Sequence, residues 1–230
     1  MVNNLIRAPA GCVLWHDYTY LINGKVPDLS GKGNVGSVNG AKLFNQLPLK
    51  GLFFDGDDDY ILVPDSPSLD VTSELTIIAW IFTKSDSRQG IVTKRTGGTT
   101  VESYLFDLSD GRKLWFNYRD STGTWQDVPK SNLIVPKEKW CMVGVIFNEG
   151  KVTLCKNTEW QKIGDYADTI YISDHPVKIG FDVATYYFKG FVLHVSKYNR
   201  ALNAREYKKI YEEFQARILK RVTPLNITMR

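Results

Sequence analysis

The amino-acid sequence predicts an all-β protein, a sandwich of two antiparallel sheets, followed by one C-terminal amphipathic α-helix. Short apolar or alternating segments recur along residues 50–198, and Gly, Asn, Asp or Pro separate them at close spacing, as turns do in antiparallel sheets. Beyond residue 203 the apolar residues recur at helical spacing instead. A chain of 230 residues that is 43% hydrophobic is long enough for one sizeable core.

Ten segments are expected to form strands, because each is a short apolar or alternating run between turn residues. They are residues 50–55, 59–63, 75–83, 90–94, 103–109, 113–119, 140–148, 151–157, 176–182 and 188–198. Gly111 and Gly150 are expected to form hairpin turns, since glycine readily adopts the positive φ that a tight reversal needs. The bulky core candidates are Phe54, Ile78, Trp80, Trp140 and Val145.

The helix is predicted to start after Asn203, which forms a capping-box pattern with Glu206 three residues later. Its apolar face carries Tyr207, Ile210, Tyr211, Phe214 and Ile218. Packing of this face on the sandwich is the simplest expectation, and a contact in a protein assembly is the alternative. Residues 1–202 are assigned to the sandwich, 203–222 to the helix and 223–230 to a terminal tail.

Charge, hydropathy and cysteine spacing argue against a nucleic-acid-binding protein, a membrane-spanning protein and a cysteine-based metal site. Residues 200–230 hold eight Lys or Arg and three Asp or Glu, which favours a solvated helix face over binding to an acidic partner, and no nucleic-acid partner is expected. Neither a membrane-spanning segment nor an export signal is evident, so we expect a soluble protein of the cytoplasm or of a virion.

Cys12, Cys141 and Cys155 lack metal-site spacing and are expected to be buried thiols. The alternative for two of them is a single disulfide between Cys141 and Cys155.

Four segments carry a family resemblance. They are VPDLSGKGNVGSVNGAK (26–42), LFFDGDDDYILVPDSPSLDVTSELTIIAWIF (52–82), WCMVGVIFNEGKVTLCKN (140–157) and FKGFVLHVSKYNRALNAREYKKIY (188–211). In this order they resemble the laminin-G-like, concanavalin A-like lectin/glucanase jelly-roll family, and the second segment is the most specific. The resemblance implies a concanavalin A-like jelly roll. Because this family mostly supplies binding modules, it also implies binding rather than catalysis.

The aspartates within FFDGDDDYILV, residues 53–63, are the first candidate for a functional site. Asp55, Asp57 and Asp59 fit the start of an EF-hand calcium loop, but Tyr60 and Ser66 stand where that loop needs Gly and Glu. We therefore expect a hairpin turn at this point rather than a calcium loop.

No cofactor is predicted. Members of the resembling family often carry a structural calcium ion, which implies a carboxylate in the closing strand, where this chain has Leu193. Leucine offers no oxygen ligand, so calcium is doubtful here. If the ion is present, Asp17, Asp28 and Asp55 are its candidate ligands.

The sequence does not indicate an enzyme. Related jelly-roll glycosidases use a Glu-x-Asp-x-x-Glu strand that points two carboxylates into a cleft, and no stretch of the chain satisfies this pattern. His16, His175 and His194 have no nearby Ser or Cys in a setting typical of nucleophilic catalysis.

Two aromatic segments are the candidate ligand-binding site, since sugar sites combine aromatic rings with groups that bond hydroxyls. Alternation along residues 114–119 places Trp115, Asn117 and Arg119 on the face opposite Leu114 and Phe116. The remaining candidates are Asp120 and Trp125 in the next loop, and Asp182, Tyr186 and Tyr187 in a loop before the last strand. The alternative is that these aromatic residues cover the second sheet or a protein interface.

The leading hypothesis is a non-catalytic module that binds carbohydrate or another cell-surface ligand. The first alternative is a virus or phage virion protein with a lectin-like fold, structural or for host attachment, because virion proteins released by lysis need no export signal. The third interpretation, a degenerate glycoside hydrolase-like protein, would require paired carboxylates across a cleft.

Overall fold

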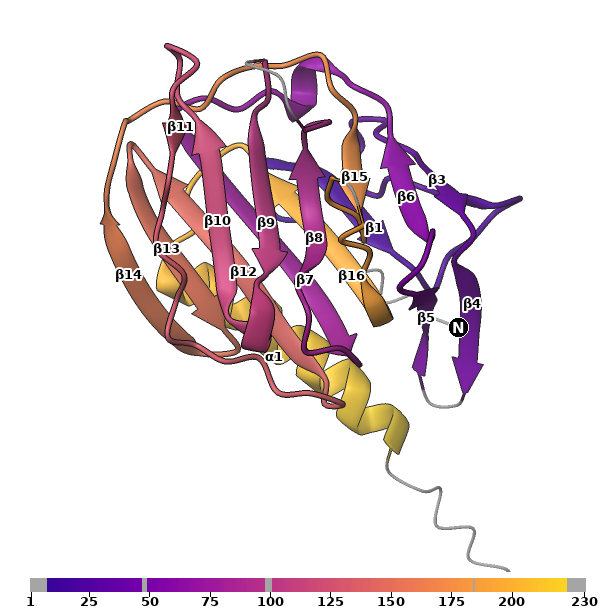
Figure 1. Cartoon of the computed structure of the whole chain (residues 1–230). Helices are drawn as coiled ribbons and strands as arrows, with labels where there is room; N and C mark the ends of the chain where they lie inside the picture. The colour runs from indigo at the N-terminus through magenta and orange to yellow at the C-terminus, as the bar shows by residue number, and fades with distance from the viewer. Residues whose placement is uncertain (1–7, 47–48, 98–100, 184, 223–230) are drawn as a thin grey trace, which may run out of the picture.

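A computed structural model of the chain describes residues 8–46, 49–97, 101–183 and 185–222 (Figure 1). These residues form two antiparallel sheets of eight strands each, stacked face to face, and one C-terminal helix. The predicted fold class, a two-sheet β-sandwich with a C-terminal helix, is confirmed.

The strands divide between two sheets. Sheet A has the order β14 (Glu159–Asp165), β13 (Lys151–Lys156), β12 (Cys141–Asn148), β7 (Glu74–Thr83), β16 (Lys189–Tyr198), β5 (Leu49–Asp55) and β4 (Lys42–Gln46), and β1 (Cys12–Asp17) also pairs with β16. Sheet B has the order β11 (Trp125–Gln126), β10 (Leu114–Arg119), β9 (Tyr104–Leu108), β8 (Gln89–Lys94), β15 (Val177–Ile179), β6 (Tyr60–Val63), β3 (Gly36–Asn39) and β2 (Lys25–Val26). All ten expected strands are present, and β1, β2, β3, β4, β11 and β14 are additional.

The central strands of sheet A are buried on both faces. On β7, Ile77 and Ala79 lie in the core between the sheets, whereas Ile78 and Trp80 lie in a second core between sheet A and helix α1 (Ala204–Val222; Figure 1). Of the other core candidates, Phe54 and Val145 lie between the sheets, and Trp140 is half-buried at the edge of the second core. Because both faces are covered, the central strands read as continuous apolar runs.

Helix α1 begins with the predicted capping box. The side-chain oxygen of Asn203 accepts a hydrogen bond from the Glu206 amide at 3.0 Å, and the Glu206 carboxylate accepts one from the Asn203 amide at 3.0 Å. In the second core α1 buries Tyr207, Ile210 and Phe214, with Tyr211 and Ile218 at the edge. The apolar face therefore packs on sheet A. None of the helices in the described ranges has the length and apolarity required to cross a bilayer.

The turns confirm two expectations and contradict a third. Gly111 and Gly150 adopt φ values of 73° and 80° in the β9–β10 and β12–β13 hairpins, as predicted. The hairpin expected around Gly56 is wrong: β5 pairs within sheet A, whereas β6 pairs with β3 and β15 in sheet B. Gly56 does reverse the chain, with φ 88°, but the reversal leads from one sheet to the other.

The three cysteines are buried free thiols, as expected. Cys141 lies in the core between the sheets and Cys155 in the core under α1, so their side chains project from opposite faces of sheet A. The alternative of a Cys141–Cys155 disulfide is therefore wrong. Burial raises the pKa of Cys12 and of Cys141 to about 12, and it raises the pKa of Cys155 as well.

Two lysines lie inside the sandwich, at the ends of β8 and β16. Lys94 is 1% exposed, and its Nζ donates hydrogen bonds to the Asp65 carboxylate at 2.6 Å and to the His175 carbonyl at 3.1 Å. Lys197 is fully buried and donates to the Leu69 carbonyl. Burial, together with the positive charge of Lys94, lowers the pKa of Lys197 to about 7.

Replacing Phe214 with Ala tests whether α1 belongs to the cooperative fold. Phe214 is 3% exposed, and loss of a buried ring costs about 3–5 kcal/mol, so we expect a matching loss in the free energy of unfolding by urea denaturation. Lys208→Ala is the matched control on the same helix, because its side chain is 63% exposed and the expected change is within about 0.5 kcal/mol. Equal stability of the two variants would contradict the expectation.

Replacing Lys197 with Met tests the titration of the buried amine. In the unfolded chain Lys197 has its ordinary pKa of 10.5, and in the fold about 7, so between these pH values the unfolded state binds more protons and stability rises with pH. Urea denaturation at about pH 7.5 to 9.5 should show wild type gaining up to roughly 1.4 kcal/mol per pH unit relative to K197M. A pH-independent difference would mean that Lys197 stays charged.

Candidate ligand-binding site on the outer face of sheet B

Strand β10 places the first group of predicted site residues on the outer face of sheet B. Leu114, Phe116 and Tyr118 point into the core between the sheets, as the alternation predicts. Trp115 and Asn117 therefore project from the opposite face. Trp115 is half-buried, and its indole Nε1 donates a hydrogen bond to the Val128 carbonyl at 2.9 Å, which fixes the ring on this face.

The loop between β15 and β16 lies over the same face and brings the second group of predicted residues to it. The Gly90 amide of β8 donates to the Tyr186 carbonyl at 2.9 Å, and the Thr93 hydroxyl donates to the Phe181 carbonyl at 3.0 Å. A Cβ on Gly90 would lie 2.3 Å from the Asp182 amide nitrogen, so the loop can approach this closely only where the strand has a glycine.

Arg88 joins the two groups. Its guanidinium lies between two aromatic rings, 4.7 Å from the ring centroid of Trp115 and 4.2 Å from that of Tyr186. Beside it is a cavity of about 350 Å³, open to solvent. The cavity is lined by Ser87, Arg88, Ser109, Asp110, Trp115, Lys130, Thr185 and Tyr186.

Two buried carboxylates hold the Arg88 guanidinium in place. Its Nε donates to Asp107 at 2.9 Å and its Nη2 to Asp182 at 2.6 Å, and both carboxylate side chains are fully buried. Arg95 also donates to Asp182, from Nε at 2.7 Å and from Nη2 at 3.0 Å. Burial raises the pKa of Asp107 well above its usual value, and the nearby Asp182 acts in the same direction while Arg88 opposes it.

The Trp125 ring lies beyond the cavity, between two further arginines. The guanidinium groups of Arg95 and Arg119 are each 5.4 Å from its centroid. Asp120 forms the turn that leads to Trp125, because its carboxylate accepts hydrogen bonds from the Thr122 amide at 2.9 Å and the Thr122 hydroxyl at 2.6 Å. These hydrogen bonds lower the pKa of Asp120, and the bond from the Thr122 hydroxyl has the largest effect.

Of the predicted site residues, the structure brings Trp115 and Tyr186 together at one cavity. Three of the four predicted polar residues, Asn117, Asp120 and Asp182, are buried and bound to other parts of the chain. Asn117, for example, accepts a hydrogen bond from the Val128 amide at 3.0 Å. The remaining three lie outside the cavity lining: Arg119 and Trp125 pair with each other, and Tyr187 stacks on Phe181 at 4.4 Å.

Sequence reasoning missed the charged part of the site. Arg88 and Lys130 lie in polar segments between strands, where no periodicity singles them out. A signal did exist for Asp107, because the hairpin at Gly111 sets the β9–β10 register and places Asp107 directly opposite Trp115. A carboxylate at an outward position beside the candidate tryptophan could have been found from that register.

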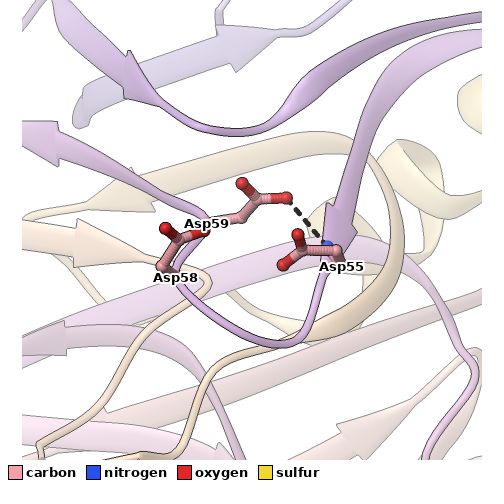
Figure 2. A group of neighbouring side chains, drawn as sticks. All are labelled: Asp55, Asp58 and Asp59. Carbon is pink, nitrogen blue, oxygen red and sulfur yellow. Dashed lines mark hydrogen bonds between the residues drawn. The ribbon is translucent and has the colours of Figure 1, made fainter.

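The aspartate cluster lies elsewhere, in the segment between β5 and β6. Asp55, Asp58 and Asp59 each have an oxygen within 4.8 Å of the others, and Figure 2 shows the three side chains gathered around the turn. Asp59 is buried and accepts a hydrogen bond from the Asp55 amide at 2.8 Å, so it closes the turn. Burial raises the pKa of Asp59, and the charges of Asp55 and Asp58 add to this effect.

Asp17, Asp28 and Asp55, the candidate ligands if calcium is present, do not lie together in one group in the described part of the chain, whereas Asp55 lies with Asp58 and Asp59. Asp17 pairs with Arg217 at 2.9 Å. Asp28 accepts hydrogen bonds from the amides of Trp15 and Asn34, each at 2.9 Å. These two carboxylates therefore hold α1 and an N-terminal loop in place.

Comparison with known proteins agrees with the fold. A family model described as the concanavalin A-like lectin/glucanases superfamily matches residues 55–206. One similar structure is domain 4 of AbnA, a GH43 extracellular arabinanase from Geobacillus stearothermophilus in complex with arabinotriose, with a TM-score of 0.68 and 15% identity over 87% of this chain and 98% of that one. Comparison with curated protein sequences gives no significant match.

Two further similar structures come from larger proteins. The binding domain of Paraclostridial Mosquitocidal Protein 1 has a TM-score of 0.67 and 18% identity over 89% of this chain and 52% of that one. Trypanosoma rangeli sialidase in complex with sialic acid has a TM-score of 0.67 and 14% identity over 92% of this chain and 34% of that one. This chain thus spans about half of the first and a third of the second. At these identities the similarity shows the fold alone.

Replacing Asp182 with Asn tests the charge cluster beneath the cavity. The change removes the buried counter-charge that Arg88 and Arg95 share and leaves them only Asp107 and Glu102, so we expect a loss of about 3–5 kcal/mol in the free energy of unfolding. Asp165→Asn removes an exposed ion pair with Lys162 at 3.4 Å, and as the control it should cost less than about 1 kcal/mol. Urea denaturation of both variants measures the difference, and equal losses would contradict the structural role of Asp182.

Proposed function

The chain belongs to the concanavalin A-like lectin/glucanases superfamily, and we propose that it is a non-catalytic module that binds carbohydrate in the cavity between Trp115 and Tyr186. The observation that carries the proposal is the composition of the cavity, which combines two aromatic rings, three hydroxyl side chains and two cationic groups. Its volume of about 350 Å³ is at the lower end of small-molecule pockets and suits a short saccharide.

The chemistry of the lining matches what a sugar offers. The hydroxyls of Ser87, Ser109 and Thr185 can donate or accept hydrogen bonds, as sugar hydroxyls do. Apolar edges of a pyranose or furanose ring would pack against the aromatic walls. One face of each wall already carries the Arg88 guanidinium, so we expect the sugar to bind across Arg88 and the ring edges rather than flat on Trp115.

The proposal assigns no hydrolysis to this site. A glycosidase needs two carboxyl groups that reach the scissile bond from opposite sides. Asp107 and Asp182 are buried and bonded to Arg88, and Asp110 is the one carboxylate among the described residues that line the cavity. A single accessible carboxylate favours binding without cleavage. Host attachment by a virion stays a prediction from the sequence.

The names of two similar structures describe binding in those proteins. The arabinanase domain is in complex with arabinotriose, and the mosquitocidal segment is a binding domain. They make saccharides the first ligands to test on this chain. The cavity on sheet B, rather than the similarity, determines which residues are to be varied.

A saccharide array followed by calorimetric titration of the best ligand tests the proposal. Trp115→Ala and Tyr186→Ala should each weaken binding about 10-fold or more, because they remove a wall of the cavity and the support of Arg88. Trp125→Ala should have a smaller effect, since Trp125 lies outside the lining. Tyr20→Ala is the control, as Tyr20 is 43% exposed and outside the cavity. Absence of saccharide binding, or equal binding by all four variants, would refute the proposal.

A further inference from the structure

Arg88 lines the cavity, and one edge of its guanidinium has no hydrogen-bond acceptor among the described residues. Of its five N–H groups, the one on Nε points to Asp107, and Nη2 lies 2.6 Å from Asp182 and 2.9 Å from Asp107. Nη1 has no acceptor among the residues that the structure describes, although the side chain is 18% exposed and lines the cavity. Two charged N–H donors are thus left for a ligand.

A second cation lies on the same cavity. Lys130 is exposed, and its Nζ is 5.1 Å from the ring centroid of Trp115, the ring on which Arg88 also packs. The opposing charge in the lining is Asp110, whose Oδ1 accepts a hydrogen bond from the Arg88 amide at 2.9 Å. One aromatic ring therefore positions two cationic side chains at one opening.

From these contacts we propose that the saccharide carries an anionic group, a carboxylate or a sulfate, which binds between Nη1 of Arg88 and Nζ of Lys130. This inference rests on the proposed carbohydrate-binding function and specifies its ligand class. A guanidinium edge matches the oxygens of such a group, and hydrogen bonds between charged partners are stronger than neutral ones.

Asp107 and Asp182 act as positioning residues in this scheme. They neutralise part of the charge of Arg88 and fix its plane between Trp115 and Tyr186. An arginine held in this way does not have to be ordered when the ligand binds, which removes part of the entropic cost of binding.

Matched pairs of saccharides test the inference by calorimetric titration. Sialyllactose and a sulfated lactose are compared with lactose, and a glucuronate oligomer with the corresponding glucose oligomer. We expect the acidic member of a pair to bind at least ~10-fold more tightly, the scale of hydrogen bonds to charged groups. The preference should shrink between about 50 and 200 mM salt because ions screen the attraction. The carboxylate and sulfate arms show which oxyanion is preferred.

Lys130→Met is the principal variant, because Lys130 is exposed and its loss leaves no buried charge behind. It should weaken binding of the acidic ligand about 3-fold, as expected for an exposed pair, and weaken binding of the neutral member of the pair less, so that the preference falls. Lys25→Met, on the far edge strand of sheet B, is the matched control and should change neither. Arg88→Lys keeps the charge but loses the paired Nη groups, and should abolish most of the preference if the variant folds.

Each outcome separates this inference from the proposed function. Equal affinity for acidic and neutral saccharides would overturn the inference and leave carbohydrate binding intact. A preference that Lys130→Met does not reduce would also overturn it, because the anionic group would then bind elsewhere. Failure of every saccharide to bind would overturn the proposed function itself. Circular dichroism of each variant confirms that the fold is retained before binding is compared.

Discussion

The burial of the centre of sheet A on both faces is the constraint on which the rest of the molecule depends. Its central strands β12, β7 and β16 need two covers, and the chain supplies sheet B on one side and α1 on the other. This requirement explains why Trp80 is as fully buried as Ile77, although the two point in opposite directions. It also leaves the outer face of sheet B as the broad surface on which a ligand can be bound.

On that face, ionic contacts take the place of a second apolar layer. Asp182 holds the β15–β16 loop against β8, and Gly90 makes the close approach possible because it has no side chain. Arg88 is then enclosed by carboxylates below and by the rings of Trp115 and Tyr186 at its sides. A buried charge cluster of this kind adds little stability compared with apolar packing, but it fixes the direction of its exposed donors.

Local sequence patterns predict the strands and the helix better than they predict which strands pair with each other. Alternation along β10 was sufficient to place Trp115 on the outer face, because residues on either side of it had to fill the core. Its proximity to Tyr186 depends on the pairing of β8 with β15, a long-range contact that no local pattern encodes. Gly56 shows the same limit, since it predicts a reversal but not the sheet that the next strand joins. β1 was missed because it ends in His16 and Asp17, which are polar yet buried.

The three separate thiols have a consequence for how this protein responds to redox conditions. A thiol whose pKa is raised by burial holds almost no thiolate, the form that alkylating reagents and oxidants attack. With Cys12, Cys141 and Cys155 unpaired and enclosed, the fold does not depend on an oxidant and is not opened by a reductant. The cysteines become reactive as the packing around them is lost, which makes them built-in reporters of unfolding.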